Sequence, residues 1–365
     1  MPSPDATPTS AAPTAGRDHD RATIAARLRA LTLPATRDLT SDALAAMPAK
    51  GVAHRHYRLA GRGLVLRVPL PSPWGGTVPD VVHYEAACFA RAEPSGATPR
   101  LVATVEPGPG LPLGALLVEE IAGHAPRLPA DLPAIATALA RLHSLPLPSP
   151  EERAPLPDHG AQGGPVVATV AVIESQRPYL DSPAASLPPD SRRLIEAEME
   201  WARRLAASAA EKAQPPLALV GTDTHPGNFV VRGEDGAAVF VDLEKTLYGA
   251  PAIDLAHASL PTSTTWDIEV QATLSPAEVR AFYAAWRDAA PPGLADATAP
   301  WLRPCRRLTW LRTIVWCVRW RAVSAERPAA GMDGHLAAHI AGRIAAFLEP
   351  EKLAGLREAA LLDPT

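Results

Sequence analysis

Cysteine is scarce in this 365-residue chain, which contains only Cys88, Cys305 and Cys317. Three widely spaced thiols argue against a disulfide framework and against a paired-cysteine zinc site. The sequence also lacks an apolar run long enough to cross a bilayer. Its first residues contain neither a basic nor an apolar segment typical of a secretory signal. We therefore expect a reduced, cytoplasmic protein with no membrane partner.

Excess charge of either sign is also missing, because the formal net charge is −4. Without a broad basic field, nucleic acid is excluded as the main partner. Hydrophobic residues make up 47% of the sequence and charged residues 20%, which is typical of a globular protein. The length allows two lobes or two domains, each with its own core.

The first third of the sequence predicts a small lobe rich in strands. Residues 1–18 are mostly Pro, Ala, Ser and Thr and predict a disordered tail. Residues 19–122 then form the predicted N-terminal lobe. Its apolar spacing predicts helices over 20–31 and 81–92 and strands over 64–68, 101–105 and 115–119.

Residues 123–365 have a helical character and form the predicted C-terminal lobe. Helical spacing recurs over 132–144, 192–212, 276–289, 302–323, 335–348 and 352–362. Two short strands, 229–232 and 238–241, flank a turn that contains Gly233 and Gly236. The predicted fold class is therefore α+β, with a β-rich N-terminal lobe and a larger helical C-terminal lobe.

The residues best suited to chemistry lie around this predicted hairpin. Asp223 and Asn228 are five residues apart on a loop that enters the first strand, and Asp242 ends the second strand. Transfer of a phosphoryl group needs a carboxylate near the attacking hydroxyl and oxygen ligands for Mg²⁺. Asp223 suits the first role, and the oxygens of Asn228 and Asp242 suit the second.

These residues carry a resemblance to a known family. The run from Leu219 to Asn228 is similar to the His-Gly-Asp-x-His-Pro-x-Asn pattern of the aminoglycoside phosphotransferase and choline kinase family. The runs 241–244 and 249–256 resemble that family's Ile-Asp-Trp-Glu and Gly-Asp-Pro-x-x-Asp-Leu-Ala patterns. Order and spacing agree over more than thirty residues, which is more specific than one short motif.

The resemblance implies a bilobal protein-kinase-like fold that binds ATP and Mg²⁺. Arg67 would be the cation on the phosphates, and Glu85 could pair with it from the following helix. Glu119 and Ile121 would bind adenine through their backbone, in the linker between the lobes. The run 51–54 lies where a loop over the phosphates is expected, although it has only one glycine.

One position departs from the family pattern. Gly221 stands where the family usually has histidine, and Thr222 stands where it usually has glycine. That histidine mainly supports the catalytic loop, so its absence leaves this support unexplained. Asp254 is expected to be a helix cap or a buried brace for the loop. His225 is also expected to brace the loop, and His257 to lie on a helix face.

Three functions remain open at this point. The leading hypothesis is an ATP- and Mg²⁺-dependent kinase that phosphorylates a hydroxyl of a small molecule. The second is a kinase-like protein that binds a nucleotide or ligand without transfer, which Gly221 suggests. The third is a metal-dependent hydrolase that uses Asp223, His225 and Asp242.

The sequence does not identify the acceptor. The run 262–267 follows the motifs, and from this position alone we expect it to line the acceptor site. Trp310, Trp316 and Trp320 are expected to fill the core of a late helix, although aromatic faces could also hold a cationic substrate.

Overall fold

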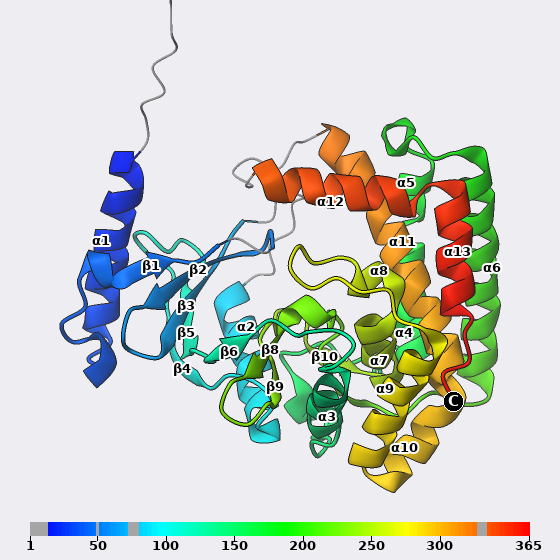
Figure 1. Cartoon of the computed structure of the whole chain (residues 1–365), viewed down its shortest axis with the longest axis horizontal. Coiled ribbons are helices and arrows are strands. Elements are labelled where there is room, and N and C mark those ends of the chain that lie inside the picture. The colour runs from blue at the N-terminus through cyan, green and yellow to red at the C-terminus, as the bar shows by residue number, and fades with distance from the viewer. Residues whose placement is uncertain (1–13, 49–50, 72–79, 327–333) are drawn as a thin grey trace, which may run out of the picture.

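The computed structural model describes residues 14–48, 51–71, 80–326 and 334–365. A strand-rich N-terminal lobe lies beside a larger helical lobe, as Figure 1 shows. This arrangement confirms the predicted α+β class with its strand-rich and helical parts.

The N-terminal lobe is built on one antiparallel sheet of five strands in the order β1-β2-β3-β5-β4. The strands are β1 (Leu44–Ala46), β2 (His54–Leu59), β3 (Leu64–Pro69), β4 (Leu101–Val105) and β5 (Ala115–Glu119). Helix α1 (Thr14–Ala30) packs on the outer side of the sheet, and helix α2 (Val81–Ala92) lies toward the helical lobe (Figure 1).

Strand β3 is buried along its whole length, and its side chains alternate between two cores. Leu64, Leu66 and Val68 belong to the core that contains α1. Val65 belongs instead to the core that contains α2. Because side chains alternate along a strand, Arg67 lies on the same face as Val65 and is directed toward the helical lobe.

Helix α2 presents one buried face to the sheet. Val82, Glu85, Phe89 and Ala92 are buried at intervals of three and four residues, which is the spacing of one helix face. The position of Glu85 on this face places a carboxylate inside the molecule, where it must find a partner.

The predicted N-terminal boundary needs a correction. Residues 1–13 of the predicted disordered tail lie outside the described residues. Helix α1 begins at Thr14, so the boundary expected at residue 18 lies inside this helix.

The helical lobe contains two small sheets. Strands β7 (Ala218–Val220) and β10 (Leu247–Gly249) form one pair. Strands β6 (Gly123–His124), β8 (Phe229–Arg232) and β9 (Ala238–Phe240) form the other sheet.

Helices form the rest of this lobe. They are α3 (Leu132–His143), α4 (Pro165–Glu174), α5 (Arg177–Leu180), α6 (Pro189–Glu211), α7 (Pro251–Ser259), α8 (Pro261–Thr264), α9 (Pro276–Ala289), α10 (Pro292–Thr298), α11 (Leu302–Glu326), α12 (Gly334–Phe347) and α13 (Pro350–Ala360). None of the helices formed by the described residues has the length and apolar character needed to cross a membrane.

The three tryptophans of α11 do not share one environment. Trp310 is fully buried and Trp320 is half-buried, whereas Trp316 is 36% exposed. The expectation that all three fill the core is therefore wrong for Trp316. The reason is that Trp316 lies on a face of α11 that is partly open to solvent. Its ring packs edge-on against the ring of Trp266, with 5.7 Å between the ring centres.

Candidate active site

The loop between β7 and β8 holds Asp223 and Asn228, and Asp242 comes two residues after the end of β9. The backbone N–H of Val241 donates to the carbonyl of Asn228 at 2.9 Å, so the hairpin brings Asp242 beside the loop. Nδ2 of Asn228 donates to the carbonyl of Asp223 at 2.8 Å. The structure thus brings these three predicted residues together.

Asp254 supports this loop from helix α7. Its carboxylate accepts hydrogen bonds from the backbone N–H groups of Gly221 at 2.7 Å and Thr222 at 2.8 Å. Nε2 of His143 lies 3.1 Å from the same carboxylate, and Oγ1 of Thr224 donates to the Asp254 carbonyl. Asp254 is fully buried. This geometry confirms that Asp254 is a buried brace.

The space beside Gly221 is filled by an aromatic ring. A Cβ atom at residue 221 would lie 2.6 Å from Cε1 of Phe240 and 2.9 Å from Cγ2 of Thr224. A histidine does not fit there unless Phe240 moves, because such distances are below van der Waals contact. Thr222 has φ of 57° and its hydroxyl donates to the carbonyl of Lys245 at 2.9 Å. The loop is therefore supported without the missing histidine.

Arg67 joins the two lobes through Asp242. Nη2 of Arg67 lies 2.7 Å from Oδ1 of Asp242, and Nη1 donates to the carbonyl of Val241 at 3.0 Å. The arginine is 5% exposed and its guanidinium carbon lies 5.6 Å from the centre of the Phe89 ring. Burial in contact with a carboxylate strengthens such an ion pair and makes its loss costly.

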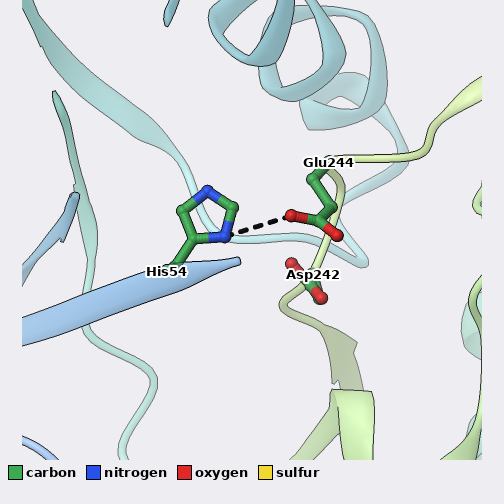
Figure 2. A group of neighbouring side chains, drawn as sticks. All are labelled: His54, Asp242 and Glu244. Carbon is green, nitrogen blue, oxygen red and sulfur yellow. Dashed lines mark ion pairs between the residues drawn. The ribbon is translucent and has the colours of Figure 1, made fainter. Parts of the chain in front are cut away.

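Glu85 does not pair with Arg67, and the prediction of that pair is wrong. Both carboxylate oxygens of Glu85 instead lie 2.9–3.0 Å from Nε2 of His54, at the start of β2. Nδ1 of His54 lies 3.1 Å from Glu244, and Figure 2 shows His54 facing Glu244 with Asp242 beside them. Because His54 engages both carboxylate oxygens of Glu85, Arg67 pairs with Asp242 instead.

His54 carries a strongly perturbed pKa. Burial alone would lower the pKa, but the hydrogen bonds to Glu244 and Glu85 raise it to about 9. The imidazole is therefore charged at neutral pH and bridges two carboxylates. The sequence predicts His54 only as the end of a possible phosphate-covering loop and indicates no partner for it.

Lys245 lies closest to the carboxylate of Asp223. Its Nζ atom is 2.5 Å from Oδ2 of Asp223 and 3.3 Å from Glu244. Burial would raise the pKa of Asp223, yet the Lys245 ammonium holds that pKa well below its ordinary value. Asp223 is therefore ionised. The only sequence signal for Lys245 is its position directly after the 241–244 motif.

The two histidines near Asp223 differ from expectation. Nε2 of His257 lies 3.8 Å from Oδ1 of Asp223, so this helix residue faces the site. Burial lowers the pKa of His257 to about 3. The rings of His225 and His257 are 6.3 Å apart, and Nδ1 of His225 is buried without a partner among the described residues. His225 therefore packs in the loop, and Asp254 provides its hydrogen-bonded brace.

A further cation reaches the loop from far along the sequence. Nη2 of Arg312, on α11, donates to the carbonyl of Thr222 at 2.6 Å. No sequence motif marked this arginine, because it lies inside a long helix and its role depends on packing.

Of the linker residues, Glu119 is the last residue of β5 and Ile121 follows two residues later. The N–H of Glu119 donates to the carbonyl of Arg100 at 3.0 Å, and the N–H of Glu120 donates to the carbonyl of Gly63. Within the part of the chain that the structure describes, no backbone hydrogen bond engages the N–H of Ile121. This amide is free to bind a ligand.

Comparison with known proteins agrees with this architecture. Residues 45–292 match the family model described as the phosphotransferase enzyme family. No curated protein sequence gives a significant match. Solved structures are similar in fold at low identity. Ethanolamine kinase of Plasmodium vivax has a TM-score of 0.56 and 13% identity, covering 86% of this chain and 84% of its own.

Two other structures give the same result. Choline kinase LicA of Streptococcus pneumoniae has a TM-score of 0.55 and 14% identity, covering 90% of this chain and 99% of its own. A GDP complex of aminoglycoside 2'-phosphotransferase-IIIa has a TM-score of 0.57 and 12% identity, covering 92% and 99%. These likenesses establish the kinase-like fold.

Proposed function

Because this chain belongs to the phosphotransferase enzyme family, we propose that it transfers the γ-phosphate of ATP to a hydroxyl of a small molecule. The observation that carries this proposal is the convergence of Asp223, Asn228, Asp242 and Arg67 from both lobes on one place. A carboxylate, two oxygen ligands and a cation are the parts that phosphoryl transfer requires.

The nucleotide is proposed to bind between the linker and Arg67. The carbonyl of Glu119 and the free N–H of Ile121 offer an acceptor and a donor to the edge of the adenine ring. Arg67 can move its guanidinium from Asp242 to the phosphates and bind them with two parallel hydrogen bonds. A similar structure that was solved as a GDP complex supports nucleotide binding at this fold.

The donor set fits Mg²⁺. Nδ2 of Asn228 is used by the carbonyl of Asp223, which leaves Oδ1 of Asn228 as a free ligand atom. Arg67 contacts only Oδ1 of Asp242, so Oδ2 is available too. Hard oxygen ligands of this kind suit Mg²⁺, with phosphate and water in its remaining positions. When bound, the ion would neutralise charge on the phosphates.

Asp223 is proposed to orient the acceptor hydroxyl and to accept its proton. Its carboxylate is ionised beside Lys245, and it is held in place by the backbone that Asp254 and Asn228 fix. Lys245 spans Asp223 and Glu244, so its ammonium is positioned to offset charge on the phosphoryl group during transfer.

The test is titration calorimetry with Mg²⁺-ATP on the wild type and on Asp242→Ala. We expect the affinity to fall at least about tenfold, since a metal ligand is lost. Asp235→Ala is the matched control, because Asp235 lies on the exposed turn between β8 and β9 and contacts only groups of that turn, Arg232 and the N–H of Ala237. Equal affinity in the wild type and Asp242→Ala would refute the metal assignment.

A non-catalytic nucleotide-binding protein is the alternative that Gly221 suggests. The packing of Phe240 beside Gly221 and the brace from Asp254 support the loop by other means, which favours transfer. Slow ATP hydrolysis that disappears in Asp223→Asn would exclude the alternative. The hydrolase hypothesis is disfavoured because the metal-type cluster in the described residues is His54, Asp242 and Glu244, without His225.

A further inference from the structure

Arg312 is a partly exposed cation beside the catalytic loop that forms no ion pair with any described carboxylate. Its guanidinium donates through Nη2 to the carbonyl of Thr222, one residue before Asp223. No carboxylate among the described residues lies within salt-bridge distance of it, and its side chain remains partly exposed. Burial opposes the charged form and lowers the pKa of Arg312, while the negative charges of Asp223 and Asp254 act in the opposite direction. A partly desolvated arginine of this kind favours an anion.

The carboxylates around it are already engaged. Asp254 accepts two backbone N–H groups, Asp242 is bound by Arg67, and Asp223 is bound by Lys245. Glu244 is bound by both His54 and Lys245. None of them forms an ion pair with Arg312, which leaves its guanidinium able to pair with an anionic group.

The positive charge of Arg312 also acts on two neutral histidines, His159 and His257. The pKa of His159 is lowered to about 4, mainly by burial and next by the positive charge of Arg312. Arg312 also contributes to the low pKa of His257. The positive charge of Arg312 thus acts on both histidines, although burial is the main cause of their low pKa values and Asp223 raises the pKa of His257. A cationic group bound beside Arg312 would be repelled by it.

Two tryptophans, Trp316 and Trp266, form an aromatic surface near Arg312 on α11. Trp316 is four residues further on, hence on the same face of the helix. It is 36% exposed, and its ring meets Trp266 edge-on at 5.7 Å. The segment that contains Trp266 reaches the catalytic loop, since a Cβ on Gly227 would lie 2.5 Å from Oδ2 of Asp267. Asp267 itself accepts the N–H groups of Glu269 and Val270.

We propose that the acceptor carries a carboxylate or phosphate group near its reacting hydroxyl, with Arg312 as the anion anchor and Trp266 and Trp316 as the surface for its apolar part. This inference rests on the proposed function, because it concerns the acceptor of the same transfer. It makes Arg312 a specificity-determining residue and excludes amino alcohols as preferred acceptors.

The test compares acceptors of one skeleton that differ only in charge. Glycerate, glycerol and 3-amino-1,2-propanediol form one set. The phenyl-bearing set is 3-phenyllactate, 3-phenyl-1,2-propanediol and 1-amino-3-phenyl-2-propanol, and glycerol 3-phosphate tests the phosphate. We expect kcat/KM, from coupled ADP detection, to be at least about tenfold higher for the anion than for the neutral member, the worth of one charge-assisted hydrogen bond. The cation should be poorest.

Arg312→Gln should bring the anion-to-neutral ratio close to one, whereas Arg312→Lys should keep most of it. Damage to the loop through the lost bond to Thr222 would lower kcat/KM for all members equally and leave the ratio unchanged, so the ratio separates anchoring from support. An unchanged ratio in Arg312→Gln, or a wild type that prefers the cation, overturns the inference.

A binding measurement separates this inference from the proposed function. Saturation-transfer NMR with Mg²⁺-ADP present should detect 3-phenyllactate bound to the wild type and not to Arg312→Gln. If this binding is seen but no compound is phosphorylated, the proposed transfer fails while the anion site stands. If the amine binds in preference to 3-phenyllactate, the anion site fails whether or not transfer occurs.

Discussion

His54 and Glu85 are joined by two contacts of 2.9 and 3.0 Å, so the buried carboxylate of α2 is held by a histidine from β2. Nδ1 of the same ring contacts Glu244, which lies in the helical lobe two residues after Asp242. One imidazole therefore ties α2, β2 and the segment after β9 together. Arg67 remains free of Glu85 and contacts Asp242.

This arrangement predicts a stability that depends on pH. The pKa of His54 is raised to about 9 in the folded protein, against an ordinary 6.5. Protonation thus favours folding, so the contribution of His54 is fully present below about pH 6.5 and is lost as the pH rises through 9. The wild type should lose up to about 1.4 kcal/mol of unfolding free energy per pH unit in this window.

Urea unfolding between these pH values measures the effect, with His54→Gln as the comparison. Glutamine can still hydrogen-bond Glu85 but cannot carry charge. The difference in unfolding free energy between the two proteins should shrink as the pH rises. Parallel curves for wild type and variant would mean that His54 is not charged in the fold.

The contact between Gly221 and Phe240 predicts a specific coupling. Gly221→Ala should destabilise the protein by about 1–3 kcal/mol, because the new methyl group overlaps the Phe240 ring. In a Phe240→Leu background the same substitution should cost less, since the ring is gone. Chemical unfolding of the two single variants and the double variant gives the coupling energy. A coupling of zero would show that the ring does not restrict residue 221.

Lys245→Met should reduce transfer about 10²-fold and leave Mg²⁺-ATP affinity nearly unchanged. The physical reason is that Lys245 contacts Asp223 and Glu244 and not the residues proposed to bind the metal. Its loss should also raise the pKa of Asp223, so the acidic limb of the pH–rate profile moves to higher pH. The profile and calorimetry measure these effects. An acidic limb that stays in place would assign the low pKa of Asp223 to another group.

A buried charge cluster far from the site predicts a change in stability alone. Glu198, 1% exposed, accepts from Arg307 at 2.6 and 2.8 Å and from Arg357 at 2.6 Å. It joins α6, α11 and α13. Glu198→Gln should cost about 3–5 kcal/mol of unfolding free energy, because two arginines lose their counter-charge. Mg²⁺-ATP affinity should not change.

Glu200→Gln is the matched control for that variant. Glu200 lies on the same helix in exposed ion pairs with Arg203 and Arg204, which contribute little. Its unfolding free energy should stay within about 1 kcal/mol of the wild type. Equal losses in the two variants would mean that burial of Glu198 is not what makes its ion pairs important.

The sequence by itself determined the local parts of the protein. The short apolar run of β3 and the helical spacing of α2 are local sequence signals, which is why both elements were predicted almost to the residue. The grouping of Asp223, Asn228 and Asp242 also follows locally, because a tight hairpin brings its two ends together. The role of Asp254 was reachable through its place at a helix start.

The tertiary structure alone decided which distant groups meet. His54 rather than Arg67 reaches Glu85, Arg312 reaches the carbonyl of Thr222 from α11, and Phe240 occupies the space beside Gly221. Each contact depends on how separately formed elements pack and which side chain is long enough to span the gap. A sequence pattern encodes the buried face of a helix or strand, but not the partner that a buried charge finds on another element. That choice fixes the charge around Asp223, and with it the acceptor that we propose.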